Sequence, residues 1–192
     1  MQMLNNRGRI ARRQKAAFSG VACAAAFCAS AQTASADGIK TAGEILRIAI
    51  PVGAAGWSLY RADYDGVLQL AVSEVIAEGV SFGLSHVIRE QRPNKTDWHS
   101  FPSDSTAISF SAASYLQIRY GWDYGLPAYA LAAFVGYSRV EAKEHHWGDV
   151  AAGALIGWGA SELTTVRYRS LAVTAFPGHQ GRPLGFSLAA TW

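Results

Sequence analysis

Five long apolar segments constrain the fold of this chain more than any other feature of its sequence. Apolar residues recur in them at the spacing of one helix face, as in the stretch from Val67 to Val80. The last segment carries no charge between Asp149 and Glu162, and its many Gly and Ala residues allow close contact between helices. We therefore expect helices over residues 42–60, 66–90, 103–120, 127–138 and 149–166.

Proline separates some of these segments. Pro93 ends the second, because proline disfavours helix in the residue before it, and Pro127 suits the first turn of the fourth. After the fifth come two short runs of alternating apolar and polar residues, 171–176 and 185–192, which suggest a hairpin. The sequence thus predicts an all-α fold, a compact bundle of about five to six helices with a short irregular or β-hairpin C-terminal tail.

The N-terminus has the layout of a secretory signal peptide. Five basic residues lie within the first fifteen positions, an apolar run follows from Ala16 to Ala31, and Ala34-Ser35-Ala36 forms a small-x-small cleavage pattern. We predict cleavage after Ala36, with an uncleaved membrane anchor as the alternative. The predicted domains are the signal peptide (1–36), a helical domain (37–170) and the tail (171–192).

Cleavage changes what the composition implies. The whole chain has a net charge of +3, but the part after residue 36 keeps 12 basic and 14 acidic residues and no cysteine. Nucleic-acid binding then loses its electrostatic support, and thiol nucleophiles and thiolate metal sites are excluded. We expect an exported, periplasmic protein. Whether it also contacts a membrane stays open, because charged residues such as Arg47 and Glu74 interrupt the apolar segments.

The chemically informative residues lie between positions 86 and 150. His145 and Asp149 are four residues apart, so on one helix the carboxylate could fix the imidazole tautomer and leave the other ring nitrogen as a nucleophile. Arg92 and Arg139 supply forked cations that suit phosphate oxygens. Ser103 lies where a helix begins, and the N–H groups of a helix N-terminus bind anions. Together these residues predict a phosphate pocket with a nucleophile.

The spacing of Ser138-Arg139, His145 and Asp149 resembles the third motif of the phosphatidic acid phosphatase type 2 superfamily, which includes bacterial acid phosphatases and vanadium haloperoxidases. Arg92-Pro93 is similar to the end of the first motif. The segment 102–105, Pro-Ser-Asp-Ser, is similar to the second motif, Pro-Ser-Gly-His. The resemblance covers about residues 64–160, most of the chain after the predicted signal peptide.

The resemblance implies a role for each matching residue. His145 would attack phosphorus and form a phosphohistidine, and Asp149 would orient it. Fixed cations and N–H groups would stabilise the charge of the transition state, so the resemblance implies no metal and no cofactor. The phosphate oxygens would be held by Arg92, Ser103, Arg139 and the backbone N–H of Asp104.

Two positions depart from the pattern of the superfamily. Ser85 stands where the first motif has Lys, so one phosphate-binding cation is missing. Asp104 and Ser105 stand where the second motif has Gly and His. That His is the general acid of the superfamily, and the loss of a positioned acid costs about 10²- to 10⁴-fold in rate. Asp104 also brings a negative charge to an anion pocket.

Three interpretations of this departure compete. In the first, another group is the acid, with His99 as the tentative candidate and a protonated Asp104 as the second. In the second, the leaving group needs little protonation, as in a diphosphate. In the third, the protein has lost turnover and binds a phosphorylated ligand or nothing.

The predicted function is that of an envelope phosphatase that hydrolyses a phosphomonoester or a lipid diphosphate through a phosphohistidine. The partners are a phosphorylated small molecule or lipid, and no nucleic acid. The alternative is a catalytically degenerate, non-enzymatic envelope protein. A zinc site of His145, His146 and Asp149 is not favoured, because no further His lies near them in the sequence.

Overall fold

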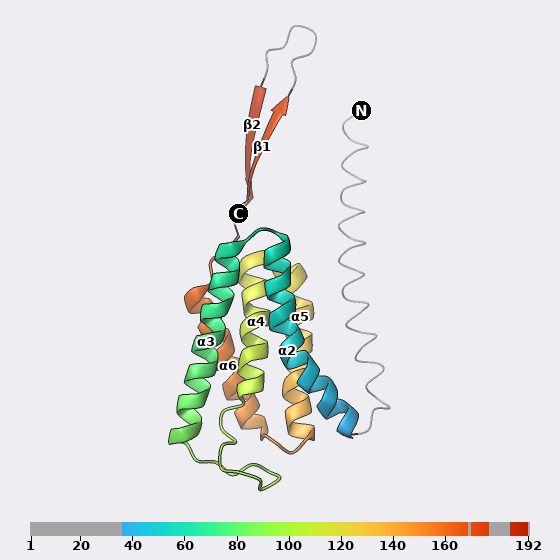
Figure 1. Cartoon of the computed structure of the whole chain (residues 1–192), viewed down its shortest axis with the longest axis vertical. Coiled ribbons are helices and arrows are strands. Elements are labelled where there is room, and N and C mark those ends of the chain that lie inside the picture. Colours follow the sequence, from blue (N-terminus) through green and yellow to red (C-terminus); the bar gives the residue numbers. More distant parts are fainter. Residues whose placement is uncertain (1–35, 169, 177–184, 192) are drawn as a thin grey trace.

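A computed structural model of the chain describes residues 36–168, 170–176 and 185–191. In these residues five helices form an upright bundle (Figure 1). The helices are α2 (Ala36–Tyr60), α3 (Tyr64–Val87), α4 (Asp104–Tyr120), α5 (Trp122–Glu141) and α6 (Trp147–Thr164). The predicted all-α bundle is confirmed. The predicted signal peptide lies outside the described residues, apart from Ala36, at which α2 begins.

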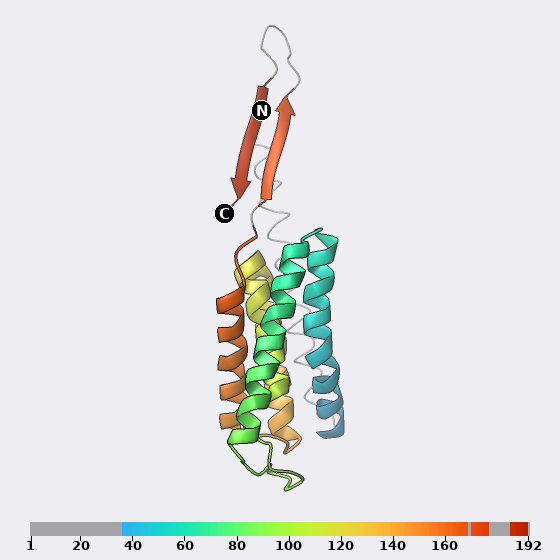
Figure 2. The same cartoon turned by 60° about the vertical axis from the view of Figure 1, so that its left-hand side comes forward.

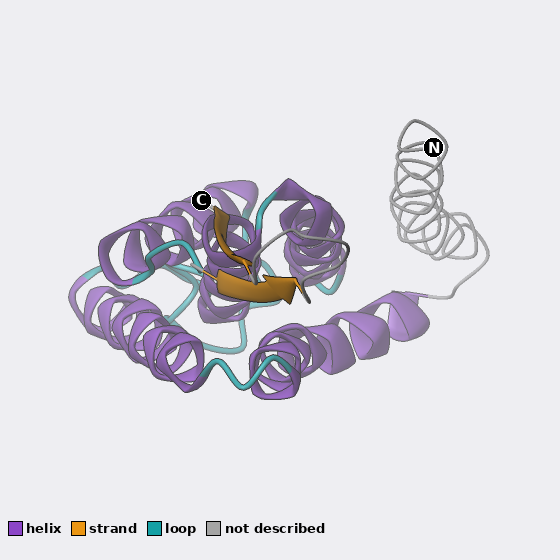
Figure 3. Ribbon diagram, turned by 90° about the horizontal axis from the view of Figure 1, so that it is seen from above, coloured by secondary structure: helices purple, strands orange, loops and turns teal. Residues whose placement is uncertain are grey.

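Helix α4 is the centre of the bundle. It packs against each of the other four helices (Figures 1 and 3), and most of its buried side chains are Ser and Ala. Helix α6 lies directly on its backbone. A Cβ atom at Gly153 would lie 2.3 Å from the carbonyl oxygen of Ser103, and one at Gly157 would lie 2.1 Å from that of Ala107. The close helix contact predicted from the small residues of this segment is therefore confirmed.

Large apolar side chains lie on the outside of the bundle rather than in its core. On α3, Leu68, Val75 and Phe82 are each about two-thirds exposed or more, at 65%, 71% and 65%. The buried apolar residues include many alanines, and many buried polar residues are serines. A protein that folds in water normally buries its large aliphatic and aromatic residues first, so this exterior is unusual.

Four helices begin earlier than the sequence predicts, α2 by six residues, α3 and α6 by two and α5 by five. Helix α5 starts at Trp122, after Gly121 with φ of 95°, and Pro127 lies inside it. Proline cannot donate a hydrogen bond to the carbonyl of Asp123, but a carbonyl this near the helix start is easily solvated. Helix α6 starts at Trp147 with His146 as its N-cap, two residues before the predicted start.

A buried ion pair closes one end of the bundle. The Nε atom of Arg119 donates to Asp63 Oδ2 at 2.7 Å, and its Nη1 donates to the carbonyl of Val166 at 2.7 Å. These bonds join the α2–α3 turn, the end of α4 and the segment after α6. Beyond this end, β1 (Ser170–Phe176) and β2 (Gly185–Thr191) pair antiparallel as a hairpin that extends away from the helices (Figure 2).

The opposite end of the bundle carries the connections 88–103 and 142–146 (Figure 1). They are tied together by a hydrogen bond from the backbone N–H of Asn94 to the carbonyl of Lys143, at 3.0 Å. Because these connections hold or flank the residues of the three predicted motifs, the predicted site lies at this end.

Candidate active site

His145 is held by a backbone carbonyl. Its Nδ1 atom lies 2.6 Å from the carbonyl oxygen of Ser100, and the ring is buried. A carbonyl oxygen only accepts hydrogen bonds, so Nδ1 carries the proton and Nε2 carries the lone pair. This is the tautomer that a nucleophilic imidazole needs.

The predicted hydrogen bond between His145 and Asp149 is absent from the structure, although the two side chains lie within ion-pair distance. The helix α6 begins at Trp147, so His145 precedes the helix and does not share a helix face with Asp149. The distance from His145 Nδ1 to Asp149 Oδ2 is 3.8 Å, which is too long for a hydrogen bond.

Asp149 acts on His145 through Ser100 instead. Its Oδ2 atom accepts hydrogen bonds from Ser100 Oγ at 2.5 Å and from the backbone N–H of His146 at 2.7 Å. The second bond belongs to the capping box of α6. The carboxylate therefore fixes the loop residue whose carbonyl fixes the imidazole. This makes Asp149 both a helix cap and a positioning residue.

The surroundings of His145 favour its neutral form. Burial lowers the pKa of His145, the hydrogen bond to Ser100 opposes that effect, and the nearby charge of Arg92 lowers the pKa again. Asp104 and Asp149 act in the opposite direction but do not outweigh burial. The charges of Arg92, Asp104 and Asp149 therefore all act on the imidazole of His145.

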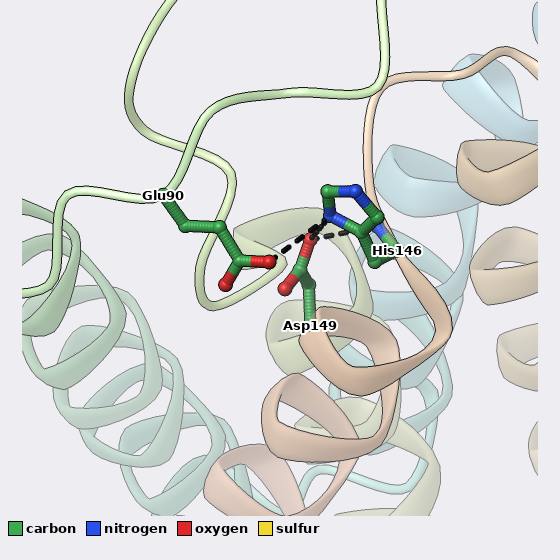
Figure 4. Close-up of side chains that lie close together, drawn as sticks. All are labelled: Glu90, His146 and Asp149. Carbon is green, nitrogen blue, oxygen red and sulfur yellow. Dashed lines mark hydrogen bonds and ion pairs between the residues drawn. The ribbon is translucent and has the colours of Figure 1, made fainter.

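Asp149 also belongs to a group of three residues that could hold a metal ion, with Glu90 and His146 (Figure 4). His146 Nδ1 lies 3.2 Å from Glu90 Oε1 and 3.4 Å from Asp149 Oδ2. A cation here would compete with the two hydrogen bonds that Oδ2 already accepts. His145, which the sequence analysis considered with His146 and Asp149 for a zinc site that it did not favour, has Nδ1 turned to Ser100. We assign no metal to this group.

Both predicted phosphate-binding arginines are paired with carboxylates. Arg92 Nε donates to Asp97 Oδ1 at 2.9 Å. Arg139 is buried, and its Nη1 donates to Glu44 at 2.5 Å and to Glu144 at 3.0 Å. Carboxylate oxygens thus occupy donors that would otherwise serve a phosphate.

Glu144 connects the two arginines. Burial alone would raise the pKa of Glu144, but a hydrogen bond from Lys40 and the charges of Arg139 and Arg92 outweigh it and lower the pKa. Arg139 contacts Glu144 directly, and Arg92 is close enough to act on the same carboxylate. The two guanidinium groups, 47 positions apart in the sequence, therefore lie near one carboxylate, and the charge of Arg92 also acts on His145.

The first turn of α4 contributes the residues of the second motif. Ser103 is buried at the N-cap, and its Oγ shares a hydrogen bond with Thr106 Oγ1 at 2.9 Å. Its N–H donates to the carbonyl of Asp149 at 3.0 Å. Asp104 Oδ1 accepts from the N–H of Ser105 at 2.7 Å, so this carboxylate is turned toward the start of its own helix.

Two further predicted positions lie around the end of α3. His99 is half-exposed; its ring contacts that of His86, with centroids 5.2 Å apart, and its N–H donates to Asp97 Oδ1. Ser85 Oγ donates to the carbonyl of Phe82, one turn back on the helix. The role of His99 as an acid stays a prediction, since the contacts described for it are with Asp97 and His86 rather than with His145.

The sequence analysis missed four residues that the structure places at the site: Glu44, Arg47, Ser100 and Glu144. Arg47 Nη1 donates to Ser105 Oγ at 3.0 Å, across 58 positions of the sequence. A signal for Glu44 and Arg47 existed, because charges are rare in an apolar helix and are kept where they have a partner. Ser100 acts through its backbone carbonyl, which leaves no signature in a sequence.

Comparisons with known proteins point in one direction. Residues 66–170 match the PAP2 superfamily. A lipid A 4'-phosphatase from Helicobacter pylori (strain J99) is 35% identical over 142 residues, which are 68% of this chain and 71% of that protein. A lipid A 1-phosphatase from Porphyromonas gingivalis is 37% identical over 76 residues, which are 38% of this chain but only 17% of that protein.

A solved structure supports the same fold. The crystal structure of Aquifex aeolicus LpxE is similar with a TM-score of 0.51 and 22% sequence identity, over 62% of this chain and 83% of that one. Helix α2, with Glu44 and Arg47, lies before the segment that matches the superfamily.

Proposed function

The chain belongs to the PAP2 superfamily, and on that premise we propose that it is an envelope phosphatase that removes phosphate from a lipid phosphomonoester or diphosphate through a phosphohistidine. The relatives named lipid A 4'-phosphatase and lipid A 1-phosphatase support a lipid as the substrate. The observation that carries the proposal is the buried His145, with Nδ1 bonded to the Ser100 carbonyl and its lone pair on Nε2.

The proposed reaction has two steps. In the first, the Nε2 lone pair of His145 attacks phosphorus, the bond from phosphorus to the leaving oxygen breaks, and its electron pair stays on that oxygen. In the second, water attacks phosphorus, the phosphorus–nitrogen bond breaks, and its electron pair returns to Nε2 while the water proton passes to solvent. The imidazole is regenerated in the tautomer that the Ser100 carbonyl favours.

Arg92 and Arg139 would bind the phosphate oxygens after exchanging carboxylate partners. Glu44 reaches Arg139 from α2, and its side chain is 43% exposed, so it can swing into solvent. Guanidinium groups suit this exchange, because the same planar fork binds carboxylate or phosphate. Resident carboxylates keep the two cations in place while no substrate is bound.

Asp104 supports turnover more directly than His99 does. Its carboxylate is close enough to act on His145 electrostatically, whereas His99 faces His86 and Asp97. We propose Asp104 rather than His99 as the group that exchanges a proton near the leaving oxygen when the substrate requires it.

Contact with a lipid bilayer is part of the proposal. Among the described residues, α3 is the one helix that is long and apolar enough to cross a membrane by length and composition. The support comes from the exterior, where large apolar residues are exposed on the four outer helices, α2, α3, α5 and α6, while the core is built largely of small residues. Helix association in lipid uses small residues in this way. Sedimentation of the expressed chain with membranes after a carbonate wash tests this part, and recovery in the supernatant rejects it.

The phosphatase activity is tested with the full chain in detergent, supplied with p-nitrophenyl phosphate, lipid A or a lipid diphosphate. We expect phosphate release that His145→Ala abolishes, and acid-labile phosphate on the wild-type protein during turnover. Release that is unchanged in His145→Ala identifies a contaminant or a different site. Vanadate binding without any turnover would support the alternative of a degenerate, ligand-binding protein, for which Ser105 in place of the superfamily His is the motivating observation.

A further inference from the structure

We propose that Arg47 is a catalytic residue that binds the leaving oxygen of the substrate, and that the enzyme therefore prefers a phosphate whose leaving group departs as a stable anion, a diphosphate above all. This inference rests on the proposed function and assigns a role to a helix outside the segment that matches the superfamily.

The first argument is that Arg47 forms no direct ion pair; the carboxylate of Asp104 reaches it only through the Ser105 hydroxyl, which donates to Asp104 Oδ1 at 3.3 Å. Arg47 Nη1 donates to Ser105 Oγ at 3.0 Å, and the group is half-buried. It makes no ion pair with an acidic side chain in the part of the chain that the structure describes, which contains every Asp and Glu. Arg92, Arg119 and Arg139 each have a carboxylate partner. A guanidinium has five donors, so Arg47 keeps capacity for an anion.

The second argument is position. Ser105, which Arg47 contacts, is the residue that stands in place of the second-motif His, next to Asp104, whose charge acts on His145. Glu44, one turn before Arg47 on α2, contacts Arg139. One face of α2 therefore contacts the site at two places, at Arg139 through Glu44 and at Ser105 through Arg47.

The third argument is that α2 is fixed in this place. A Cβ atom at Gly43 would lie 1.9 Å from Ser138 Oγ and 2.9 Å from Arg139 Nη2, so the backbone of α2 lies directly on the end of α5. Arg47, one turn further along, is held at a set distance from the first turn of α4. A preorganised cation of this kind stabilises developing charge at little reorganisation cost.

The chemistry of the group decides the substrate class. A guanidinium does not give up its proton in a protein, so Arg47 cannot protonate an alkoxide. It can pair with an oxygen that keeps the electron pair of the broken phosphorus–oxygen bond. When the leaving group is a phosphate, as in a diphosphate, the departing oxygen is already a stable anion and no proton transfer is required.

The experiment compares full-chain variants in detergent on a lipid diphosphate, a lipid phosphomonoester and a series of aryl phosphates of graded leaving-group pKa. We expect Arg47→Gln to lower kcat/KM by about 10²- to 10³-fold on the diphosphate, and to make the rate depend more steeply on leaving-group pKa across the aryl series. Arg47→Lys, which keeps the charge, should recover part of the loss. The matched control is Arg167→Gln, an exposed arginine at the other end of the bundle, which should match the wild type.

A second variant protects the test from a folding artefact. Adding Ser105→His to Arg47→Gln places a titratable acid at the same position, and it should restore the phosphomonoester reaction with a new loss of rate at high pH, where the imidazole loses its proton. If Arg47→Gln lowers kcat/KM by the same factor on every substrate and leaves its dependence on leaving-group pKa unchanged, Arg47 is structural and the inference is wrong. If the wild-type chain shows no His145-dependent turnover at all, the proposed function itself fails, and this role with it.

Discussion

The imidazole of His145 and the backbone of Ser100 form one unit, in which Nδ1 donates to the carbonyl oxygen at 2.6 Å. The Asp149 carboxylate binds the hydroxyl of the same serine at 2.5 Å. The acidic residue that the sequence motif places beside the histidine therefore acts through a loop residue that lies in no motif. This arrangement determines how mutations at Asp149 and Ser100 should differ.

Asp149→Asn should lower kcat by about 10- to 100-fold, the value of one hydrogen bond to a charged group, because it weakens the support of the Ser100 loop without removing the carbonyl. Ser100→Ala should cost less, since the carbonyl that holds His145 belongs to the backbone and stays. Steady-state kinetics of both variants beside His145→Ala measures this order. An Asp149→Asn defect as complete as that of His145→Ala would instead indicate a direct His–Asp pair in the working enzyme.

The pKa of His145 should respond in opposite directions to the removal of two nearby charges of opposite sign. Arg92→Gln removes a positive charge that lowers this pKa, so the pKa should rise, whereas Asp104→Asn removes a negative charge that raises it, so the pKa should fall. The ¹⁵N chemical shift of the labelled imidazole as a function of pH reports both changes. Shifts of the same sign in the two variants would show that the charges of Arg92 and Asp104 do not act on the ring as described.

The same lowering of the pKa sets a stability trend. Between the folded and unfolded pKa values of His145, the unfolded chain binds more protons, so the contribution of this group to the free energy of unfolding falls as the pH falls. Activity should follow the neutral imidazole and persist below the pH at which an ordinary histidine becomes protonated.

Glu44 should compete with the substrate for Arg139. Glu44→Gln removes the negative charge that contacts Nη1, so vanadate should bind about two- to five-fold more tightly, in keeping with the small energies of partly exposed ion pairs. Glu141→Gln, an exposed residue at the end of α5, is the control. Titration calorimetry at low salt measures the difference, which should shrink as salt is added. Weaker binding in Glu44→Gln would mean that the carboxylate holds Arg139 in place and does not obstruct it.

The contact between α6 and α4 should tolerate no added methyl group. Gly157→Ala places a Cβ 2.1 Å from the Ala107 carbonyl oxygen, so we expect a loss of about 1–3 kcal/mol or more in the free energy of unfolding. Gly159→Ala on the same helix meets nothing within 4 Å and should be neutral or stabilising by up to about 1 kcal/mol. Thermal unfolding in detergent compares the two. Equal stability of both variants would contradict the described packing.

The sequence predicts the scaffold better than the site. Helix periodicity and small residues sufficed for the bundle and for the packing of α6, because both depend on side chains close together in the chain. The helix starts were placed too late at Pro127 and Asp149, since proline near a helix start and a capping histidine gave no clear boundary. The expectation that His145 and Asp149 share a helix face fails because α6 begins at Trp147, after His145.

The remaining site contacts join residues that are far apart in the sequence. Arg47 meets Ser105 across 58 positions, and Glu44 meets Arg139 across 95. Neither pair shares a motif, and α2 precedes the segment that the superfamily pattern covers. Packing of α2 onto α4 and α5 creates these contacts, and no local pattern encodes that packing.

The glycines of α6 also limit which substitutions the contact between α6 and α4 can accept. At Gly153 and Gly157 a Cβ atom would overlap the carbonyl oxygens of Ser103 and Ala107, so no larger residue fits into the present gap between α4 and α6. Any substitution there can only widen it. Variants designed to change the site therefore have to alter the side chains around it, since the packing of α6 against α4 beneath them leaves no room for larger residues.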